Sequence, residues 1–305
     1  MTGQAIPLRS QDLVFTLYGD YLLDRPAPVW AGSLIVLLGQ LGLSEMAVRT
    51  VLSRLARKRW LTVEKRGTRS YYGLTRKGRK LLEEGRERIY HPPRTSTWDG
   101  SWFVVTYSIP EERRRLRDLL RVKLLWLGCG PVTNGTWITP HDVREEVRAI
   151  AAMLRVTRHV EVVQGAHLGF STPRDLVAQC WDLATIDAGY AAFLQRWSRD
   201  YGRCRECGAG GRGGKVTPAI PSCRHPADCF VRRFLLVHEY RRFPLEDPFL
   251  PPDLLPDGWK GGEAARLFER YHDALTVPAE RYVNDVCQAG EEDDVRTAMA
   301  VAAGN

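Results

Sequence analysis

Basic side chains are concentrated between Val48 and Lys80, where the sequence reads VRTVLSRLARKRWLTVEKRGTRSYYGLTRKGRK. This stretch holds twelve Lys or Arg residues and one acidic residue, Glu64. Guanidinium and ammonium groups at this density can neutralise the phosphates of a nucleic acid. A run of charges is also often no more than a solvated surface, so the elements that carry these residues must decide between the two interpretations.

Two helices joined by a short turn are expected around this segment. An apolar helix ends near Gly42, and Ser44 then offers the short side-chain oxygen of a good N-cap for a helix over residues 45–59. The apolar face of that helix would consist of Val48, Val51, Leu52 and Leu55. The turn LGLS gives the pair the spacing of a helix-turn-helix, whose second helix reads the major groove of DNA.

A two-stranded hairpin is expected directly after this helix. Residues 60–64 and 70–74 are rich in β-branched and aromatic types, and KRGTR between them supplies the glycine of a tight turn. Such a hairpin is a wing whose basic tip can reach phosphates or the minor groove. Because the charge coincides with this layout, we favour DNA binding over a solvated surface. The expected DNA contacts are Ser44, Arg49, Thr50, Ser53, Arg54, Arg57 and Lys58 on the helix, and Lys65, Arg66 and Arg69 on the wing.

The charge distribution supports a basic N-terminal domain. Residues 1–93 carry 16 Lys or Arg and 8 Asp or Glu, whereas the rest of the chain carries 28 of each, so the whole excess of +8 lies in the first third. The 305 residues are enough for two or three domains. No apolar run approaches the length of a membrane span and no secretion signal is recognisable. We therefore expect a cytoplasmic protein that does not contact a membrane.

The middle of the chain predicts a second domain. Strand and helix patterns alternate from SWFVVTYSI to VTRHVEVVQGA in the order βαββαβ, with a hairpin at Asn134-Gly135. This order is that of the ferredoxin-like fold. Helical periodicity dominates afterwards. The expected fold class is α+β, with a winged helix-turn-helix over residues 1–92, a ferredoxin-like domain over 93–172, a helical effector or dimerisation domain over 173–286 and a flexible tail over 287–305.

Four cysteines lie in a glycine-rich insertion over residues 200–229 of the helical domain. They are Cys204, Cys207, Cys223 and Cys229, with His225 among them. The first pair has the C-x₂-C spacing of a structural zinc site, but the second pair does not. A flexible loop with incidental thiols, a zinc clip and a redox switch all remain open. No cofactor is required, and zinc is a possibility at this insertion only.

The sequence contains no recognisable catalytic motif. His238 and Glu239 in HEYRR are adjacent, so on a helix they point to different faces and do not form an acid–base pair. A phosphate-binding glycine loop, a nucleophile elbow and the HExxH metal motif do not occur. We therefore expect no enzyme activity and assign no catalytic residue.

Several strings along the chain together resemble the PaaX family of transcriptional repressors of phenylacetate catabolism. They are LGLSEMAVRTVLSRLARKRWL, YYGLTRKGRKLL, RIY at 88–90 and LVHEYRRFPLEDPFLPPDLLPDGWKG. The resemblance covers nearly the whole chain and implies a repressor that leaves its operator when an aryl- or acyl-CoA thioester such as phenylacetyl-CoA binds. The basic residues nearest the last string, with its histidine, are the expected effector contacts: Arg232, Arg233, His238, Arg241 and Arg242.

The middle domain also resembles the small CRISPR-associated nucleases. Those enzymes hold a metal with an Asp near the end of the first strand, where this chain has Ser108. A neutral hydroxyl is a poor ligand for Mg²⁺. The expected function is therefore a DNA-binding repressor of a catabolic operon, acting as a homodimer on a two-fold operator. The alternatives are a metal- or redox-responsive regulator that uses the cysteines, and a metal-dependent nuclease.

Overall fold

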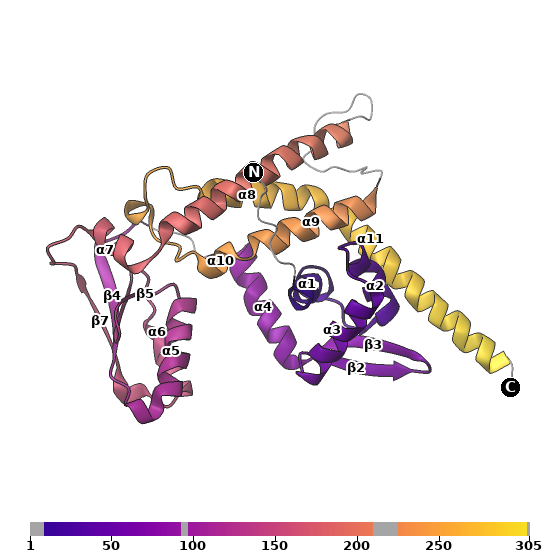
Figure 1. The fold of residues 1–305 in the computed structure, drawn as a ribbon, viewed down its shortest axis with the longest axis horizontal. Helices are drawn as coiled ribbons and strands as arrows, with labels where there is room; N and C mark the ends of the chain where they lie inside the picture. Colours follow the sequence, from indigo (N-terminus) through magenta and orange to yellow (C-terminus); the bar gives the residue numbers. More distant parts are fainter. Residues whose placement is uncertain (1–8, 93–96, 210–224, 304–305) are drawn as a thin grey trace. The chain divides into compact units, whose positions relative to one another are not determined.

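The computed structural model describes residues 9–92, 97–209 and 225–303, with the side chains of 205–209 and 292–303 left out. The fold mixes helices with two antiparallel sheets (Figure 1). The chain forms two compact units. Unit 1 comprises residues 1–91, 195–240 and 265–305, and unit 2 comprises residues 92–194 and 241–264.

The N-terminal part of unit 1 contains the expected pair of helices with a hairpin. Its elements are α1 (Ser10–Leu17), the π-helical turn η1 (Tyr18–Leu22), β1 (Val29–Trp30), α2 (Ala31–Gly39), α3 (Glu45–Arg57), β2 (Leu61–Arg66), β3 (Arg69–Leu74) and α4 (Arg76–Tyr90). The strands form a three-stranded antiparallel sheet in the order β1-β3-β2. Val29 and Trp30 directly precede the apolar helix α2 in the sequence, and they pair with Tyr72 and Tyr71 of β3.

Three long helices from the second half of the chain complete unit 1. They are α8 (Leu183–Ala209), whose last part belongs to the unit, α9 (Pro226–Tyr240) and α11 (Gly261–Ala303), of which all but the first residues belong to it. Phe230 and Phe234 of α9 and Val283 and Cys287 of α11 lie in the same apolar core as the buried residues of α1, α2 and α3. In Figure 1, α9 crosses beside α1, and α11 runs past α2.

This packing differs in two respects from what the sequence pattern suggests for the second half of the chain. The compact units do not follow the three consecutive domains predicted, because α9 and α11 bury their apolar faces against the N-terminal helices. The segment expected to be a flexible tail is helical as far as Ala303. Cys287, the first residue of that segment, is buried because it faces the core that α11 shares with α2 and α3.

Unit 2 contains a four-stranded antiparallel sheet in the order β5-β6-β4-β7. Its elements are β4 (Ser101–Tyr107), η2 (Glu111–Arg113), α5 (Arg114–Trp126), β5 (Gly130–Thr133), β6 (Thr136–Thr139), α6 (Arg144–Met153), η3 (Thr157–His159) and β7 (Val160–Ala166). Apart from the short 3₁₀ turns, this is the βαββαβ order expected from the sequence.

Both faces of this sheet are covered, as the continuous apolar run of β4 implies. Phe103, Val105 and Tyr107 pack with α5 and α6 on one face. Trp102 lies in a second core with α7 (Pro173–Cys180) and with residues of the proline-rich segment 244–259, including Leu254. Two short helical turns lie in or next to that segment, α10 (Phe243–Glu246) and η4 (Pro252–Leu254).

Among the described residues, no helix combines the length and the apolar character that a membrane-spanning helix needs.

Candidate nucleic-acid interface

The helix α3 presents a basic face to solvent. It begins as expected at Ser44, whose Oγ accepts a hydrogen bond from the backbone N–H of Ala47 at 3.3 Å. Its four expected apolar residues are buried in the core of unit 1. The six predicted contact residues that follow Ser44 are all exposed: Arg49, Thr50, Ser53, Arg54, Arg57 and Lys58. The amphipathic pattern therefore places the predicted contacts where a ligand can reach them.

The basic residues of α3 differ in how they are held. Arg49 forms an ion pair with Glu45 one turn earlier, with 2.8 Å between Nη2 and Oε1. Arg54, Arg57 and Lys58 have no acidic partner among the residues that the structure describes. Exposed ion pairs on a helix contribute only about 0.3–0.5 kcal/mol. All four cations are thus available to an anionic ligand at small cost.

One further exposed residue of α3 was not among the sequence predictions. Met46 is 78% exposed in the first turn of α3, three and four residues before Arg49 and Thr50. On a helix this spacing puts the three side chains on one stripe. An apolar side chain on such a stripe can contact the methyl group of thymine. An apolar residue on the otherwise polar face was the sequence signal that could have identified it.

The β2–β3 hairpin forms a wing with a basic tip. Arg66 pairs with Arg69 across a two-residue turn, and Gly67 adopts the positive φ of 56° that such turns require. Arg66 donates from Nε to Glu64 Oε1 at 2.9 Å and lies over the ring of Tyr71. The hydrogen bond from Arg66 lowers the pKa of the Glu64 carboxyl, which keeps it charged. Arg66 is therefore held along the wing, and Lys65 beside it is exposed.

Arg69 differs from the other predicted wing contacts. It is half-buried, its guanidinium lies over the ring of Trp30, and its Nη1 donates to the backbone carbonyl of Gly290 in α11 at 3.1 Å. From the hairpin pattern alone, we expected the Arg69 side chain to contact DNA. In the structure it points toward α11, where the Gly290 carbonyl accepts its hydrogen bond, and no local sequence pattern could have revealed this acceptor.

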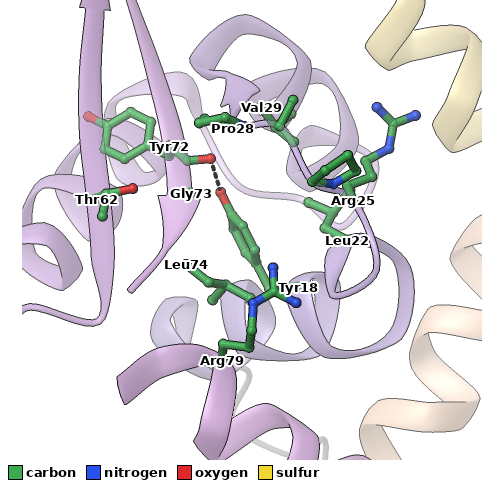
Figure 2. Close-up of a pocket in the computed structure, with 12 residues that line it drawn as sticks. Tyr18, Leu22, Arg25, Pro28, Val29, Thr62, Tyr72, Gly73, Leu74 and Arg79 are labelled. Atoms are coloured by element: carbon green, nitrogen blue, oxygen red, sulfur yellow. Dashed lines mark hydrogen bonds between the residues drawn. The ribbon is translucent and has the colours of Figure 1, made fainter. Parts of the chain in front are cut away.

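A small cavity lies at the base of the wing (Figure 2). It has a volume of about 90 Å³ and is lined by η1, the residues before β1, and parts of β2, β3 and α4. Tyr18 donates from its hydroxyl to the carbonyl of Tyr72 at 3.0 Å, and Arg79 donates to the carbonyl of Leu23 at 2.6 Å. Ligand pockets are usually at least about 300 Å³, so this cavity is too small for a CoA thioester.

A buried group of polar side chains joins the N-terminal helices to α9 and α11. Asp20 in η1 accepts from Arg233 Nη2 at 3.2 Å and from the Tyr90 hydroxyl at 2.7 Å. Arg233 Nε also donates to His272 Nε2 at 3.0 Å, which requires a lone pair on that nitrogen. Burial alone would raise the pKa of Asp20, but the adjacent His272 and the charge of Arg233 outweigh burial and lower it. Asp20 and Arg233 thus form a desolvated ion pair.

Two of the predicted effector contacts are buried inside unit 1, where they bind other side chains. Arg233 is 3% exposed and bound as described above. His238 is buried, with its Nδ1 2.8 Å from Thr16 Oγ1. Since the Thr16 hydroxyl itself donates to the Asp12 carbonyl, His238 Nδ1 is the donor in this pair. Asp20 and Thr16, which bind Arg233 and His238 respectively, each lie more than 200 positions away in the sequence, so no local pattern could reveal these contacts.

The three remaining predicted effector contacts lie near the surface. Arg232 forms an ion pair with Asp200 at 3.1 Å, and Arg242 lies 4.0 Å from Glu246. Arg241 is half-buried. Arg232 belongs to unit 1, whereas Arg241 and Arg242 belong to unit 2. No common site for the five residues is therefore described.

The described residues contain few side chains that could support nuclease activity or bind a metal ion. Ser108 follows β4 directly, is exposed, and donates its backbone N–H to the carbonyl of His159. Within the described ranges, no group of three or more His, Cys, Asp or Glu side chains is arranged to hold a metal ion. Cys204 and Cys229 are buried, whereas Cys223 and the side chain of Cys207 lie outside the described residues. The zinc and redox predictions stay untested.

Comparison with known proteins defines the class to which this arrangement belongs. Family models match in chain order: PaaX-like protein over residues 9–78, the PaaX protein central Cas2-like domain over 95–177 and the PaaX-like protein C-terminal domain over 181–285. The transcriptional repressor PaaX of Escherichia coli (strain K12) is 30% identical over 290 residues, which cover 92% of this chain and 85% of that protein. The class is that of transcriptional repressors.

The chain belongs to the PaaX family. A solved structure, the uncharacterized protein Rv0674 from Mycobacterium tuberculosis, is similar with a TM-score of 0.51 and 23% sequence identity. The similarity covers 90% of this chain and 96% of that one. At this level of identity the structure supports the fold alone.

Proposed function

We propose that the protein is a DNA-binding transcriptional repressor whose residues 9–91 act as a winged helix-turn-helix. The observation that carries this proposal is the exposed basic face of α3, whose Arg54, Arg57 and Lys58 have no acidic partner among the described residues. Family membership supports the repressor role. In this proposal α3 enters the major groove, and the tip of the β2–β3 wing contacts phosphates.

The β4–β7 sheet with α5 and α6 has, in our interpretation, a ferredoxin-like fold with a structural role. A position for a metal-binding carboxylate is occupied by Ser108, which disfavours phosphodiester cleavage by a hard metal ion. We further propose that the repressor works as a homodimer, because one recognition helix alone gives modest specificity and two-fold operators match two-fold proteins.

The proposed signal for release is an aryl- or acyl-CoA thioester. Family membership supports this choice, and coenzyme A carries phosphates that arginines recognise. Arg232 of unit 1 and, separately, Arg241 and Arg242 of unit 2 remain candidate contacts, because Arg233 and His238 are engaged inside unit 1. The ligand must bind the DNA-incompetent state more tightly than the competent one. A hundredfold loss of operator affinity needs about 2.7 kcal/mol of coupling, which is within the range of ordinary allostery.

The experiment begins with selection of a binding site from random-sequence duplexes by the full-length chain. Fluorescence anisotropy then measures affinity for the selected duplex and for an unrelated duplex of equal length at several salt concentrations. We expect a preference for the selected duplex and a steep salt dependence. Arg66→Ala should weaken both duplexes alike and reduce the salt slope by about 0.9. Equal affinity of the unmodified chain for both duplexes would refute a sequence-specific repressor.

Effector identity is tested by titrating phenylacetyl-CoA, other acyl-CoA thioesters and the free acids against the selected complex. Release by thioesters and not by the acids supports the proposal. Release by zinc or by an oxidant, with no response to any thioester, would instead favour the regulator that uses Cys204 and its neighbours. Elemental analysis of the purified protein adds a direct test of zinc, and loss of metal in Cys204→Ser/Cys207→Ser would locate it.

A further inference from the structure

Gly290 lies in α11 at a place where a Cβ atom would force neighbouring side chains to move. A Cβ atom at this position would lie 2.6 Å from Ser33 Oγ and 2.8 Å from a ring carbon of Trp30. Glycine inside a helix costs roughly 0.5–1 kcal/mol relative to alanine. The close approach of α11 to β1 and α2 explains why glycine occupies this position despite its cost to the helix.

The backbone at Gly290 is bound by the wing. Arg69, the first residue of β3, donates from Nη1 to the Gly290 carbonyl at 3.1 Å. The guanidinium of Arg69 also lies over the ring of Trp30, 4.5 Å from its centroid. Trp30 therefore contacts both the wing arginine and the glycine surface of α11. We call Trp30, Arg69 and Gly290 the wing clasp.

The preceding turns of α11 hold this part of the helix against the N-terminal elements. Ser33 donates from its hydroxyl to the Val286 carbonyl at 3.1 Å, and Cys287 is buried in the core of unit 1. Arg25 donates to the Asn284 side chain at 2.7 Å. These contacts recur along one side of α11. The close contact at Gly290 therefore belongs to a continuous packed seam, which we define as the side of α11 from Asn284 to Gly290.

We propose that Arg69 is a positioning residue for DNA binding, which fixes the direction of the wing by binding α11 at Gly290. A two-stranded hairpin is only marginally stable by itself, so its direction depends on what holds its strands. Arg69 pairs with Arg66 across the turn. A fixed Arg69 therefore sets where Lys65 and Arg66 present their charges.

This inference rests on the proposed DNA-binding function, and the competing interpretation is a direct contact of Arg69 with a phosphate. The two differ in what a change at Gly290 does. Gly290→Val adds no charge and removes none, so a direct phosphate contact by Arg69 would survive it. Under the clasp, Gly290→Val displaces Trp30 and α11 and thereby releases the wing.

The affinity test uses the full-length chain with the selected duplex. The variants are Gly290→Val, Arg69→Lys, which keeps the charge, and their combination, with Ala289→Val as the control because Ala289 is exposed on the same helix. We expect each clasp variant to raise the Kd about tenfold and the combination to raise it no further, as for coupled residues. Unchanged affinity in Gly290→Val, or additive losses in the combination, would overturn the proposal.

Hydrogen exchange of the free protein gives a second readout that needs no DNA. Amides of residues 61–74 should exchange faster in Gly290→Val and Arg69→Lys than in Ala289→Val, whereas amides of α3 should remain protected. Gly290→Ala provides a milder change if the valine variant fails to fold. Faster wing exchange in a chain that binds no duplex would sink the DNA-binding function but keep the clasp. Normal wing exchange in both variants would sink the clasp alone.

Discussion

Arg49 is held by Glu45 on the very face that we propose for DNA. The pair is exposed on both sides, so the ion pair is weak and the carboxylate also repels phosphates. We expect Glu45→Gln to strengthen binding of any duplex about two- to threefold, because Arg49 is released and one negative charge disappears. Anisotropy at low salt measures this change, and Glu146→Gln, an exposed carboxylate of unit 2, is the control. Weaker binding in Glu45→Gln would contradict the orientation of α3.

Arg54 is the residue of α3 for which the largest effect is expected. It lies in the middle of the exposed stripe and has no acidic partner among the described residues. A bidentate contact with a guanine is worth about 1–3 kcal/mol of discrimination. Arg54→Ala should therefore weaken binding to the selected duplex by that amount and change the unrelated duplex much less.

The control for this change is Arg121→Ala on α5, an exposed arginine in unit 2. It should leave both affinities unchanged. An Arg49→Ala/Arg54→Ala double variant with normal affinity for the selected duplex would remove α3 from the interface.

The turn η1 and the helix α9 are connected by charges as well as by apolar contacts. Asp20 and Arg233 are each nearly inaccessible and form an ion pair. Removal of one partner of a buried pair leaves an uncompensated charge and typically costs about 3–5 kcal/mol. Asp20→Asn should lower the free energy of unfolding by an amount of this order, measured by urea denaturation. A conservative change at exposed Asp24, Asp24→Asn, should cost far less.

The same pair predicts a dependence of stability on pH. The pKa of Asp20 is below its ordinary value of 3.8 in the folded protein. Because the pKa is lowered on folding, ionisation of Asp20 stabilises the folded protein fully at pH values above the ordinary pKa. This stabilisation disappears as the pH falls through the lowered pKa of the folded protein. The stability difference between the unmodified chain and Asp20→Asn should therefore be constant near neutral pH and shrink in strong acid. A difference that grows in acid would contradict the charged state of Asp20.

Local sequence patterns predicted the helices and strands better than they predicted which of them contact one another. The caps at Ser44 and Thr75 act over three residues, and both are present. The alternation of strands and helices in unit 2 is likewise readable from the chain. By contrast, the two-residue β1 is too short to give a pattern, and nothing near Asp20 in the sequence indicates that Arg233 and His272 contact it. The exposed basic face of α3 was thus predictable, whereas the contact of Arg69 with the Gly290 carbonyl was not.

At the scale of the whole molecule, the chain passes between its two units more than once. Residues 92–194 build unit 2 before the chain returns to unit 1 for α9, and 241–264 belong again to unit 2. The apolar core beneath α3 includes residues of α9 and α11. A fragment of residues 1–92 would expose this surface. We expect it to unfold at lower urea concentration than the full chain and to bind the selected duplex weakly.

Circular dichroism and anisotropy of the purified fragment measure both effects. A second chain that lacks only residues 295–305 is the control, since it keeps Gly290 and the packed seam before it. If the fragment matches the full chain in stability and affinity, the N-terminal residues form an independent module and α9 and α11 are dispensable for it.

The burial of Cys287 and Gly290 against α2 and β1 has a consequence for how the protein comes into being. A ribosome adds about 5–20 residues per second, and domains usually fold as they emerge. Here the first helices to emerge must wait, with an apolar side uncovered, until the residues near 290 have left the exit tunnel. Nascent chains and products of premature termination would therefore lack a finished wing. We therefore expect a chain whose message is cut short upstream of this point to bind the selected duplex only weakly, as we expect for the fragment of residues 1–92.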